Sequence, residues 1–363
     1  MKHKRFIAFM APSLIVMLLF IALPIVSVAY QSLFVEHEQV LVEVENCGPF
    51  GCTTETSIDT DSMAQLREEE PMGRFNGLGT YLNAAHLAVD EIAEIWSNSP
   101  SVGQAFSSIV NLPFYKALSF TLAYTFIVTT LCIILGFIIA VCVNTLPSLL
   151  KGPVIFFSLL PMIVTPLIGS LVLFWMIDAR GVIGSSLQLL FDDPQLSLKA
   201  SPTLTWITLF VYDVWHSIPF SFVVFYADLQ TVPQDTLESS MVDGATRWQR
   251  IRYVVIPYLM PLAVFIALMQ LMDNFRVFEP IVGFNAQSNA TSLSYQIYTD
   301  LRLGDAPLYG SAAATSMLTI LGRHHPANTC ADSHLARVFT QMMIPGFTQN
   351  AQRTDGILIN GKS

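Results

Sequence analysis

Apolar residues of this chain are gathered in long blocks, with polar connections between them. Five of these blocks are long enough for helices that cross a hydrocarbon layer, because about 20 residues at about 1.5 Å each span about 30 Å. They run approximately from Phe6 to Tyr30, Ala117 to Leu146, Val154 to Ile177, Leu204 to Asp228 and Tyr258 to Phe284. The pattern predicts an all-α fold, a polytopic bundle of transmembrane helices.

A sixth apolar block begins near Tyr309 and stops at Leu321. About 12 residues of helix cover only about 18 Å, so this block is too short to cross the layer. The residues from Gly322 onward lose the apolar character that such a helix needs. We expect a truncated sixth span followed by an aberrant polar tail over 322–363, and we hypothesise that the reading frame shifts near codon 321. A genuine five-span protein is the alternative.

Lys and Arg in the short connections indicate which side of the bundle faces the cytoplasm, because positive charge is retained there. These residues gather before the first block, after the second and after the fourth: Lys2, Lys4, Arg5, Lys151, Arg247, Arg250 and Arg252. In an alternating topology all three places fall on one side. We therefore expect a cytoplasmic N-terminus and a periplasmic location for the long segment 31–115.

The first block also allows a second interpretation. A basic start, an apolar run and Ser27-Val28-Ala29 together are compatible with a cleaved signal peptide. The apolar run exceeds the roughly 7–15 residues usual for such a peptide, and Pro24 inside it is typical of a kinked permanent span. We expect residues 1–30 to form an N-terminal anchor span.

Composition agrees with a membrane protein. Of 363 residues, 53% are apolar and 12% are charged, and the mean hydropathy is +0.53. Average soluble domains have about 25% charged residues. The formal charge of −9 does not favour nucleic acid as a partner. The expected partners are lipid, a solute and other proteins.

Segment 31–115 is too long for a simple connection. Cys47 and Cys52 favour a disulfide-closed turn in an oxidising compartment, and a metal-binding pair is the alternative. The run Arg67-Glu68-Glu69-Glu70-Pro71 makes part of the segment strongly polar. The segment is either a small cap that contacts a solute-binding protein or a partly disordered insertion.

A polar and basic segment lies between the fourth and fifth blocks. Glu238 near the start of a helix is favoured by the helix dipole, and Gly244 permits close approach or a bend between two short helices. Arg247 and Arg250 share a helix face, and Trp248 offers an apolar anchor for a partner protein. This segment is suited to docking on another subunit. An amphipathic loop on anionic lipid is the alternative.

The order and spacing of these residues resemble the cytoplasmic coupling motif of ABC-importer permeases. The shared elements are Glu238, then Asp243, Gly244 and Ala245, then Arg247, Trp248, Gln249 and Arg250, and a closing run from Val254 to Pro257. Ser239 and Ser240 stand where the motif has alanines. Pro257 marks the return of the chain into the membrane. The runs VYDVWHSIPF from Val211 and FRVFEPIVGF from Phe275 look like segments of carbohydrate-uptake permeases, and the resemblance covers most of residues 6–35 and 72–320.

The resemblance implies a permease subunit of an ATP-driven importer in the bacterial inner membrane. Its expected partners are a second permease, two ATPase subunits and a periplasmic solute-binding protein. The chain itself is expected to carry no cofactor and to catalyse no covalent reaction. The implied organisation is an anchor over 1–30, a periplasmic insertion over 31–115, a permease domain over 116–321 with the coupling motif at 238–257, and the tail.

Polar side chains within the expected spans are candidate solute contacts, because each is costly in hydrocarbon unless it faces the bundle interior. Asp213, His216 and Ser217 are spaced to share one face of the fourth span. Gln270, Asp273 and Asn274 repeat that spacing on the fifth. A path that hydrogen-bonds sugar hydroxyls is one interpretation. The structural alternative is an ion pair between Asp273 and Arg276 and a bridge between helices at Asp213.

Motifs elsewhere in the chain bear on functions other than transport. The last eight residues, Gly356 to Ser363, match a phosphate-binding loop pattern, but no helix follows to cradle a phosphate. A membrane enzyme would need a nucleophile with a base or a metal cluster, and the sequence has no His-Glu-x-x-His or Gly-x-Ser-x-Gly motif. A metal site at His324, His325 and Cys330 and a scaffold without transport are further alternatives. For a permease, the alternatives to a sugar or polyol are glycerol phosphate and a polyamine.

Overall fold

The computed structural model describes residues 2–37, 40–48, 51–193, 197–302 and 307–330 of the chain. The chain divides into two units, Met1–Met317 and Leu318–Ser363. The phosphate-loop pattern at Gly356–Ser363 and the tail beyond residue 330 lie outside the described residues. The side chains of His324, His325 and Cys330 lie outside them as well.

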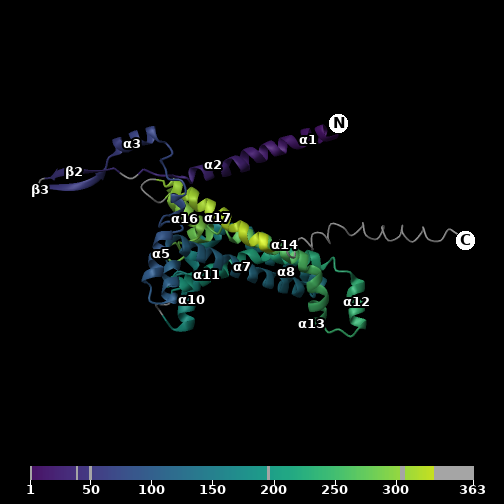
Figure 1. Ribbon diagram of the computed structural model, residues 1–363. Helices are drawn as coiled ribbons and strands as arrows, with labels where there is room; N and C mark the ends of the chain where they lie inside the picture. The colour runs from purple at the N-terminus through teal and green to yellow at the C-terminus, as the bar shows by residue number, and fades with distance from the viewer. Residues whose placement is uncertain (1, 38–39, 49–50, 194–196, 303–306, 331–363) are drawn as a thin grey trace. The chain divides into compact units, whose positions relative to one another are not determined.

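The first third of the chain is a long helix followed by short strands and helices (Figure 1). The bounds are α1 Lys2–Met17, η1 Leu18–Ala22, α2 Leu23–Gln31, β1 Phe34–Val35, β2 Leu41–Gly48, β3 Gly51–Ile58, α3 Thr60–Glu69, β4 Arg74–Phe75, α4 Gly79–Leu82, α5 Val89–Asn98 and α6 Val102–Val110. The symbol η marks a π-helical turn.

The rest of the described chain is helical, as the apolar blocks predict. The bounds are α7 Pro113–Asn144, α8 Ser148–Ile163, α9 Pro166–Met176, α10 Val182–Phe191, α11 Pro202–Leu229, α12 Gln234–Val242, α13 Arg247–Arg250, η2 Ile251–Val255, α14 Ile256–Asn274, α15 Glu279–Gly283, α16 Leu293–Arg302 and α17 Tyr309–Cys330. The all-α fold class is confirmed.

Among the described residues, four helices are long and apolar enough to cross a membrane: Phe9–Gln31, Pro113–Asn144, Pro202–Leu229 and Arg247–Asn274. They correspond to the first, second, fourth and fifth apolar blocks. The third block is a pair of helices, α8 and α9, and counting this pair gives up to five spans. Helix α17 does not meet the same criteria, in agreement with the expectation of an incomplete sixth span.

The third block differs from the single helix that its hydropathy suggests. Helices α8 and α9 are bent by 93° at a break formed by Val164 and Thr165. Pro166 begins α9, and a proline forces the residue before it out of the helical region. Thr165 accordingly has an extended backbone, with φ −65° and ψ 142°. Hydropathy counts apolar residues and does not register this constraint.

The fifth block begins earlier and ends earlier than expected. The helix starts at Arg247, because Thr246 and Gln249 form a reciprocal capping box that satisfies free backbone N–H groups. It ends at Asn274, and the short helix α15 follows after a turn. The expected boundaries, Tyr258 and Phe284, are therefore wrong by about three turns at each end.

Pro257 was expected to mark the return of the chain into the membrane. It lies inside this continuous helix and not at its start. The π turn η2 ends two residues before it, and the N–H of Ile256 donates to the carbonyl of Ile251. A proline ring clashes with the carbonyl four residues earlier in an α-helix, and a wider turn relieves that clash. Pro24 stands in the same relation to η1, where the Leu23 N–H donates to Leu18. Both helices therefore continue through a proline.

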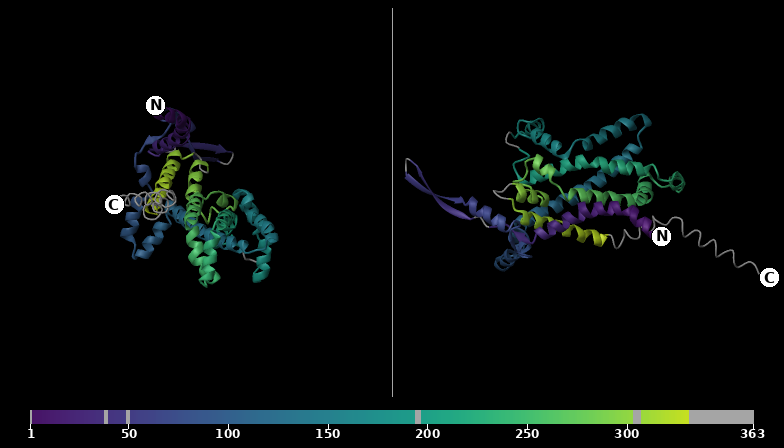
Figure 2. Two further views of the ribbon diagram at one scale, coloured as in Figure 1. Left: turned by 90° about the vertical axis from the view of Figure 1, so that its right-hand side faces the viewer. Right: turned by 90° about the horizontal axis from the view of Figure 1, so that it is seen from above.

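The three long helices α7, α11 and α14 lie side by side (Figures 1 and 2). Gly136 permits the close approach of α7 to α11, since a Cβ at this position would lie 2.6 Å from Cβ of Ser221. Two apolar clusters hold the bundle, one around Phe120 and Ile281 and the other around Phe222 and Leu259. Polar side chains lie between these clusters.

Segment 31–115 contains two antiparallel strand pairs, β1 with β4 and β2 with β3. The segment contacts α17 through His86. This residue is fully buried, and its Nε2 lies 3.1 Å from both the Ser311 carbonyl oxygen and the Thr315 hydroxyl. Asp59 caps α3, and hydrogen bonds from Ser62 lower the pKa of this carboxyl. The described part of the segment is therefore built from regular elements.

Cys47 and Cys52 are directly opposite each other in the register of β2 and β3. Directly opposed residues in an antiparallel pair have Cα atoms about 4.5–5.5 Å apart, within the range that a disulfide spans. An isolated hairpin of two strands is marginally stable, so a covalent link would stabilise it. The disulfide itself stays a prediction, because the described side chains do not include these two.

We predict that Cys47 and Cys52 are oxidised in protein made in bacterial cells. A maleimide that adds mass to free thiols should leave them unlabelled until a reductant is added. The variant Cys47→Ser should free the thiol of Cys52 for labelling without reductant, and Cys142→Ser serves as the control for the exposed cysteine of α7. Labelling of wild-type Cys47 without reductant would contradict the prediction.

Candidate functional site

A polar cavity of about 350 Å³ lies among α7, α11, α14 and the starts of α9 and α15. We call it the central cavity. Its lining residues are Tyr124, Pro166, Asp213, His216, Ser217, Asp273, Asn274, Arg276, Val277, Glu279 and Pro280. A second space of about 280 Å³ shares His216, Ser217, Asp273 and Arg276 with it and is also lined by Gln270. Each of the five candidate solute residues named from the sequence lines at least one of these two spaces.

Asp213 is the most buried carboxyl of the central cavity, with 8% of its surface exposed. The hydroxyl of Tyr124 lies beside it and is also buried. This hydroxyl makes no hydrogen bond of ordinary length and angle among the described residues. Two polar groups therefore face the cavity from neighbouring helices, α7 and α11.

Gln270 and Asn274 each bridge two helices through their amide nitrogens. The Gln270 amide donates to the Ser217 carbonyl at 3.3 Å, and the Asn274 amide donates to the Thr129 hydroxyl at 3.0 Å. Both side chains are nearly fully buried. Their spacing on α14 lets one face of this helix contact α11 and α7 together.

Asp273 and Arg276 form the ion pair that the structural alternative anticipated, at 2.8 Å. Both side chains are more than half exposed, so the pair contributes at most about 1 kcal/mol. The two residues nevertheless line the cavity. The ion pair and a place in the cavity wall are therefore compatible.

His216 forms a hydrogen bond with the backbone at the break between α8 and α9. Its Nε2 lies 2.9 Å from the Val164 carbonyl oxygen, and the Tyr212 hydroxyl donates to the Pro166 carbonyl at 2.8 Å. Both carbonyls lie at the bend, where the regular helical pattern is interrupted. His216 therefore has a structural partner as well as a position at the cavity.

Tyr124 and Glu279 were not among the candidates predicted from the sequence. Tyr124 is one of several hydroxyl residues in a strongly apolar helix, and periodicity does not distinguish it from a packing residue. Glu279 was assigned to the interior of a longer fifth span, whereas it begins the separate helix α15. Glu279 immediately before Pro280 was a usable signal, since proline favours the first turn of a new helix.

The segment expected to couple with an ATPase consists of α12, a tight turn and the start of the helix from Arg247. Gly244 in the turn has φ +79°, which favours glycine. The N–H of Ala245 donates to Ser240 and that of Gly244 to Met241, the two bonds of a Schellman motif. Gly244 therefore lies at a bend, as one of its two expected roles required, but the bend joins the short helix α12 to the long helix that begins at Arg247.

The side chains expected to dock on a partner are exposed at this turn. Trp248 is 66% exposed, and Arg247, Met241 and Val242 are exposed as well. Glu238 is also exposed but lies past the first turn of α12, where Asp235 is found instead, so the expected dipole contact of Glu238 is wrong. We call Met241, Val242, Arg247 and Trp248 the coupling surface.

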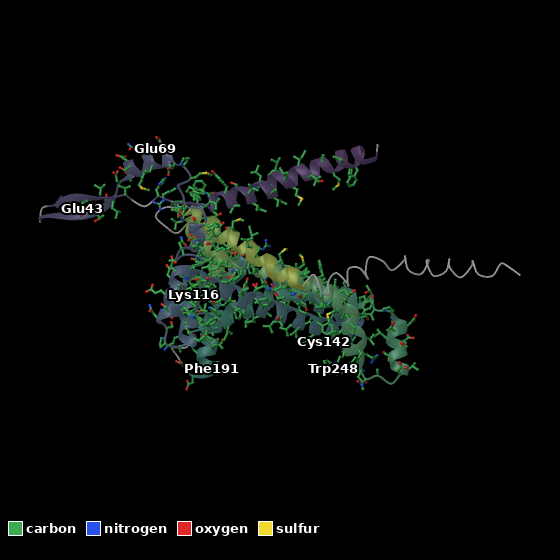
Figure 3. All side chains as sticks on the ribbon, in the orientation of Figure 1. Glu43, Glu69, Lys116, Cys142, Phe191 and Trp248 are labelled. Carbon is green, nitrogen blue, oxygen red and sulfur yellow. The ribbon has the colours of Figure 1, made fainter. Side chains whose placement is uncertain are left out.

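The coupling surface lies at one end of the bundle (Figure 3). Trp248 and Cys142 are at this end, and Lys116 and Phe191 are at the opposite end. A hydrogen bond between Gln230 and Asn144, at 3.0 Å, ties α11 to α7 at the same end as Trp248. The fold and the site define a multi-pass helical membrane protein with a polar interior cavity and an exposed turn at one end.

Residues 132–322, more than half of the chain, match the family described as binding-protein-dependent transport system inner membrane component. The chain belongs to this family. The trehalose/maltose transport system permease of Thermococcus litoralis is 27% identical over 252 residues, which cover 67% of this chain and 82% of that protein. The maltodextrin permease of Bacillus subtilis is 29% identical over 56% of this chain, and the match spans only 51% of its length. The resemblance to carbohydrate-uptake permeases is thereby confirmed.

Solved structures show the same fold. A crystal structure of a bacterial ABC transporter involved in the import of the acidic polysaccharide alginate has a chain that aligns with a TM-score of 0.53 at 18% identity, covering 73% of this chain and 95% of that one. A complex of the alginate transporter with a pentasaccharide-bound periplasmic protein aligns with a TM-score of 0.52 at 20% identity, covering 69% and 90%. At this identity the similarity concerns the fold alone.

We predict that the bond from His216 to the Val164 carbonyl stabilises the break between α8 and α9. His216→Phe should lower the free energy of unfolding by about 0.5–1.5 kcal/mol, because the exposed Val164 carbonyl at the break loses its hydrogen-bond donor. His216→Gln keeps a donor and should lose less. Thermal unfolding in detergent measures the difference, with Trp215→Phe on the same helix as control. Equal losses in the Phe and Gln variants would show that the donor is unimportant.

Proposed function

We propose that this chain is the permease subunit of an ATP-driven importer that moves a sugar, polyol or related saccharide across the inner membrane. The observation that carries the proposal is the central cavity, where hydroxyl, amide and carboxyl groups gather inside an otherwise apolar bundle. Such groups are suited to binding the hydroxyls of a sugar. The names of the relatives, which are sugar transport permeases, support the same substrate class.

The proposed orientation places the N-terminus and the coupling surface in the cytoplasm. Its support is the distribution of Lys and Arg, since Lys151 and Arg247 lie in connections that the topology puts on one side. Segment 31–115, with its cysteine pair, then faces the periplasm. A solute-binding protein would reach the bundle from that side.

The proposed partners are a second permease, two ATPase subunits and a periplasmic solute-binding protein. The coupling surface would bind an ATPase, with Trp248 as the apolar anchor and Arg247 as a polar contact. The neighbouring Arg250 and Glu238 would add further polar contacts. Asp243, Gly244 and Ala245 would set the angle between α12 and the following helix. ATP would be hydrolysed by that partner and not by this chain.

The proposed transport cycle depends on the continuous helix from Arg247 to Asn274. Movement of the docked turn would shift this helix together with Gln270, Asp273 and Asn274, which line the cavity spaces. The cavity would thereby open alternately to the two sides of the membrane. Pro257 lies in the transmitting helix, and the π turn before it keeps the helix continuous.

We also propose that family-like sequence ends near residue 321 because the reading frame changes there. The family match ends at residue 322, one residue after the apolar run stops. Sequencing of the gene through this codon in all frames tests the proposal. An apolar run that continues in another frame is expected. An intact frame, with the tail detected in the purified protein by mass spectrometry, would refute it.

We predict that Trp248→Ala weakens the binding of the ATPase partner by at least about tenfold, since buried aromatic anchors contribute about 2 kcal/mol or more to interfaces. Co-purification of the ATPase and solute-stimulated ATP hydrolysis measure the effect. Trp96→Ala is the matched control, because Trp96 is similarly exposed, at 62% against 66%, and lies in α5. Unchanged co-purification of Trp248→Ala would place the docking surface elsewhere.

A further inference from the structure

The carboxylates of the central cavity outnumber its cations. Asp213, Asp273 and Glu279 contribute carboxylates, and Arg276 is the single Lys or Arg among the lining residues. Arg276 pairs with Asp273 at 2.8 Å. Within the described part of the chain, Asp213 and Glu279 therefore have no ion-pair partner.

Burial makes the unpaired carboxylate of Asp213 unusual. A carboxylate that leaves water needs a compensating cation or several donors, and the protein places only the hydroxyl of Tyr124 beside it. Asp273 and Glu279 are close enough to add repulsion. A positive charge brought by a bound solute would remove this imbalance.

The Tyr124 hydroxyl, which lies beside Asp213, gives a second indication of a ligand. Its side chain is 1% exposed, and its hydroxyl makes no ordinary hydrogen bond within the described residues. Buried hydroxyls in proteins usually have a partner, so an unpaired one in a cavity wall indicates a group that is supplied from outside. Tyr124 and Asp213 face the same cavity.

We infer that the solute of the central cavity is a saccharide that carries a protonated amine. An ammonium group has three donors, and Asp213 with Glu279 would accept from it while Tyr124 bonds a sugar hydroxyl. The inference rests on the proposed saccharide function and adds the charge class of the solute. An anionic saccharide would meet two unpaired carboxylates and be rejected.

Calorimetric binding to the full-length protein in nanodiscs tests this inference with three probes. The β-1,4-linked dimer of glucosamine carries amines, cellobiose is its neutral counterpart, and spermidine is a cation without a sugar skeleton. The glucosamine dimer should bind at least about tenfold more tightly than cellobiose. Asp213→Asn should remove this preference, and Glu279→Gln, at an exposed position, should reduce it.

Controls separate charge recognition from folding. Asp228→Asn removes a carboxylate from the same helix outside the cavity and should leave the preference unchanged. Tyr124→Phe should weaken both dimers by a similar factor and keep their ratio. If Asp213→Asn does not fold, as judged by its unfolding temperature, the Glu279→Gln result decides the inference.

Each remaining result bears on one of the two proposals. Equal affinity for the two dimers, or a preference that survives the deciding substitution, would overturn the charge class and leave a saccharide permease. Spermidine binding more tightly than both dimers would overturn the saccharide function while keeping a cation site. Binding of none of the probes would overturn both.

Discussion

Backbone carbonyls inside a hydrocarbon layer need donors from the protein, because water does not reach them. The break between α8 and α9 exposes this requirement at the bend in the third block. His216 and Tyr212 of α11 meet it by bonding to the carbonyls of Val164 and Pro166. The position of α9 against α11, and with it the wall of the central cavity that contains Pro166, depends on these two bonds.

The polar residues of the bundle serve both structure and the proposed transport. Gln270 and Asn274 hold α14 against α11 and α7 through hydrogen bonds that are made in the interior. Asp213 and Tyr124, in contrast, leave bonding capacity unused toward the cavity. A bundle whose polar groups were all satisfied internally would offer a solute no hydrogen-bond partners, so the division between satisfied and unsatisfied groups supports the proposed binding function.

Hydropathy and spacing were sufficient for part of this picture. The blocks around α7 and α11 became helices close to the expected bounds, and the spacing of Asp213 and His216 correctly placed them on one side of α11, toward the cavity. The break at Pro166 and the early start at Arg247 depend on backbone constraints and a capping box, which averaged hydropathy does not register. Tyr124 was missed because a single sequence does not show which helices face each other.

The uninterrupted helix from Arg247 to Asn274 would move as one rigid body in the proposed cycle, with Trp248 in its first turn. Its 28 residues make it about 42 Å long at about 1.5 Å per residue. If the helix pivots at one end, a tilt of about 5° displaces the other by on the order of 4 Å, close to the diameter of a sugar ring. A small rotation of the helix at the turn before Arg247 would therefore give a large displacement at Asn274, because the helix is long. A hinge at Pro257 would absorb that rotation, and the π turn before Pro257 keeps the helix continuous there.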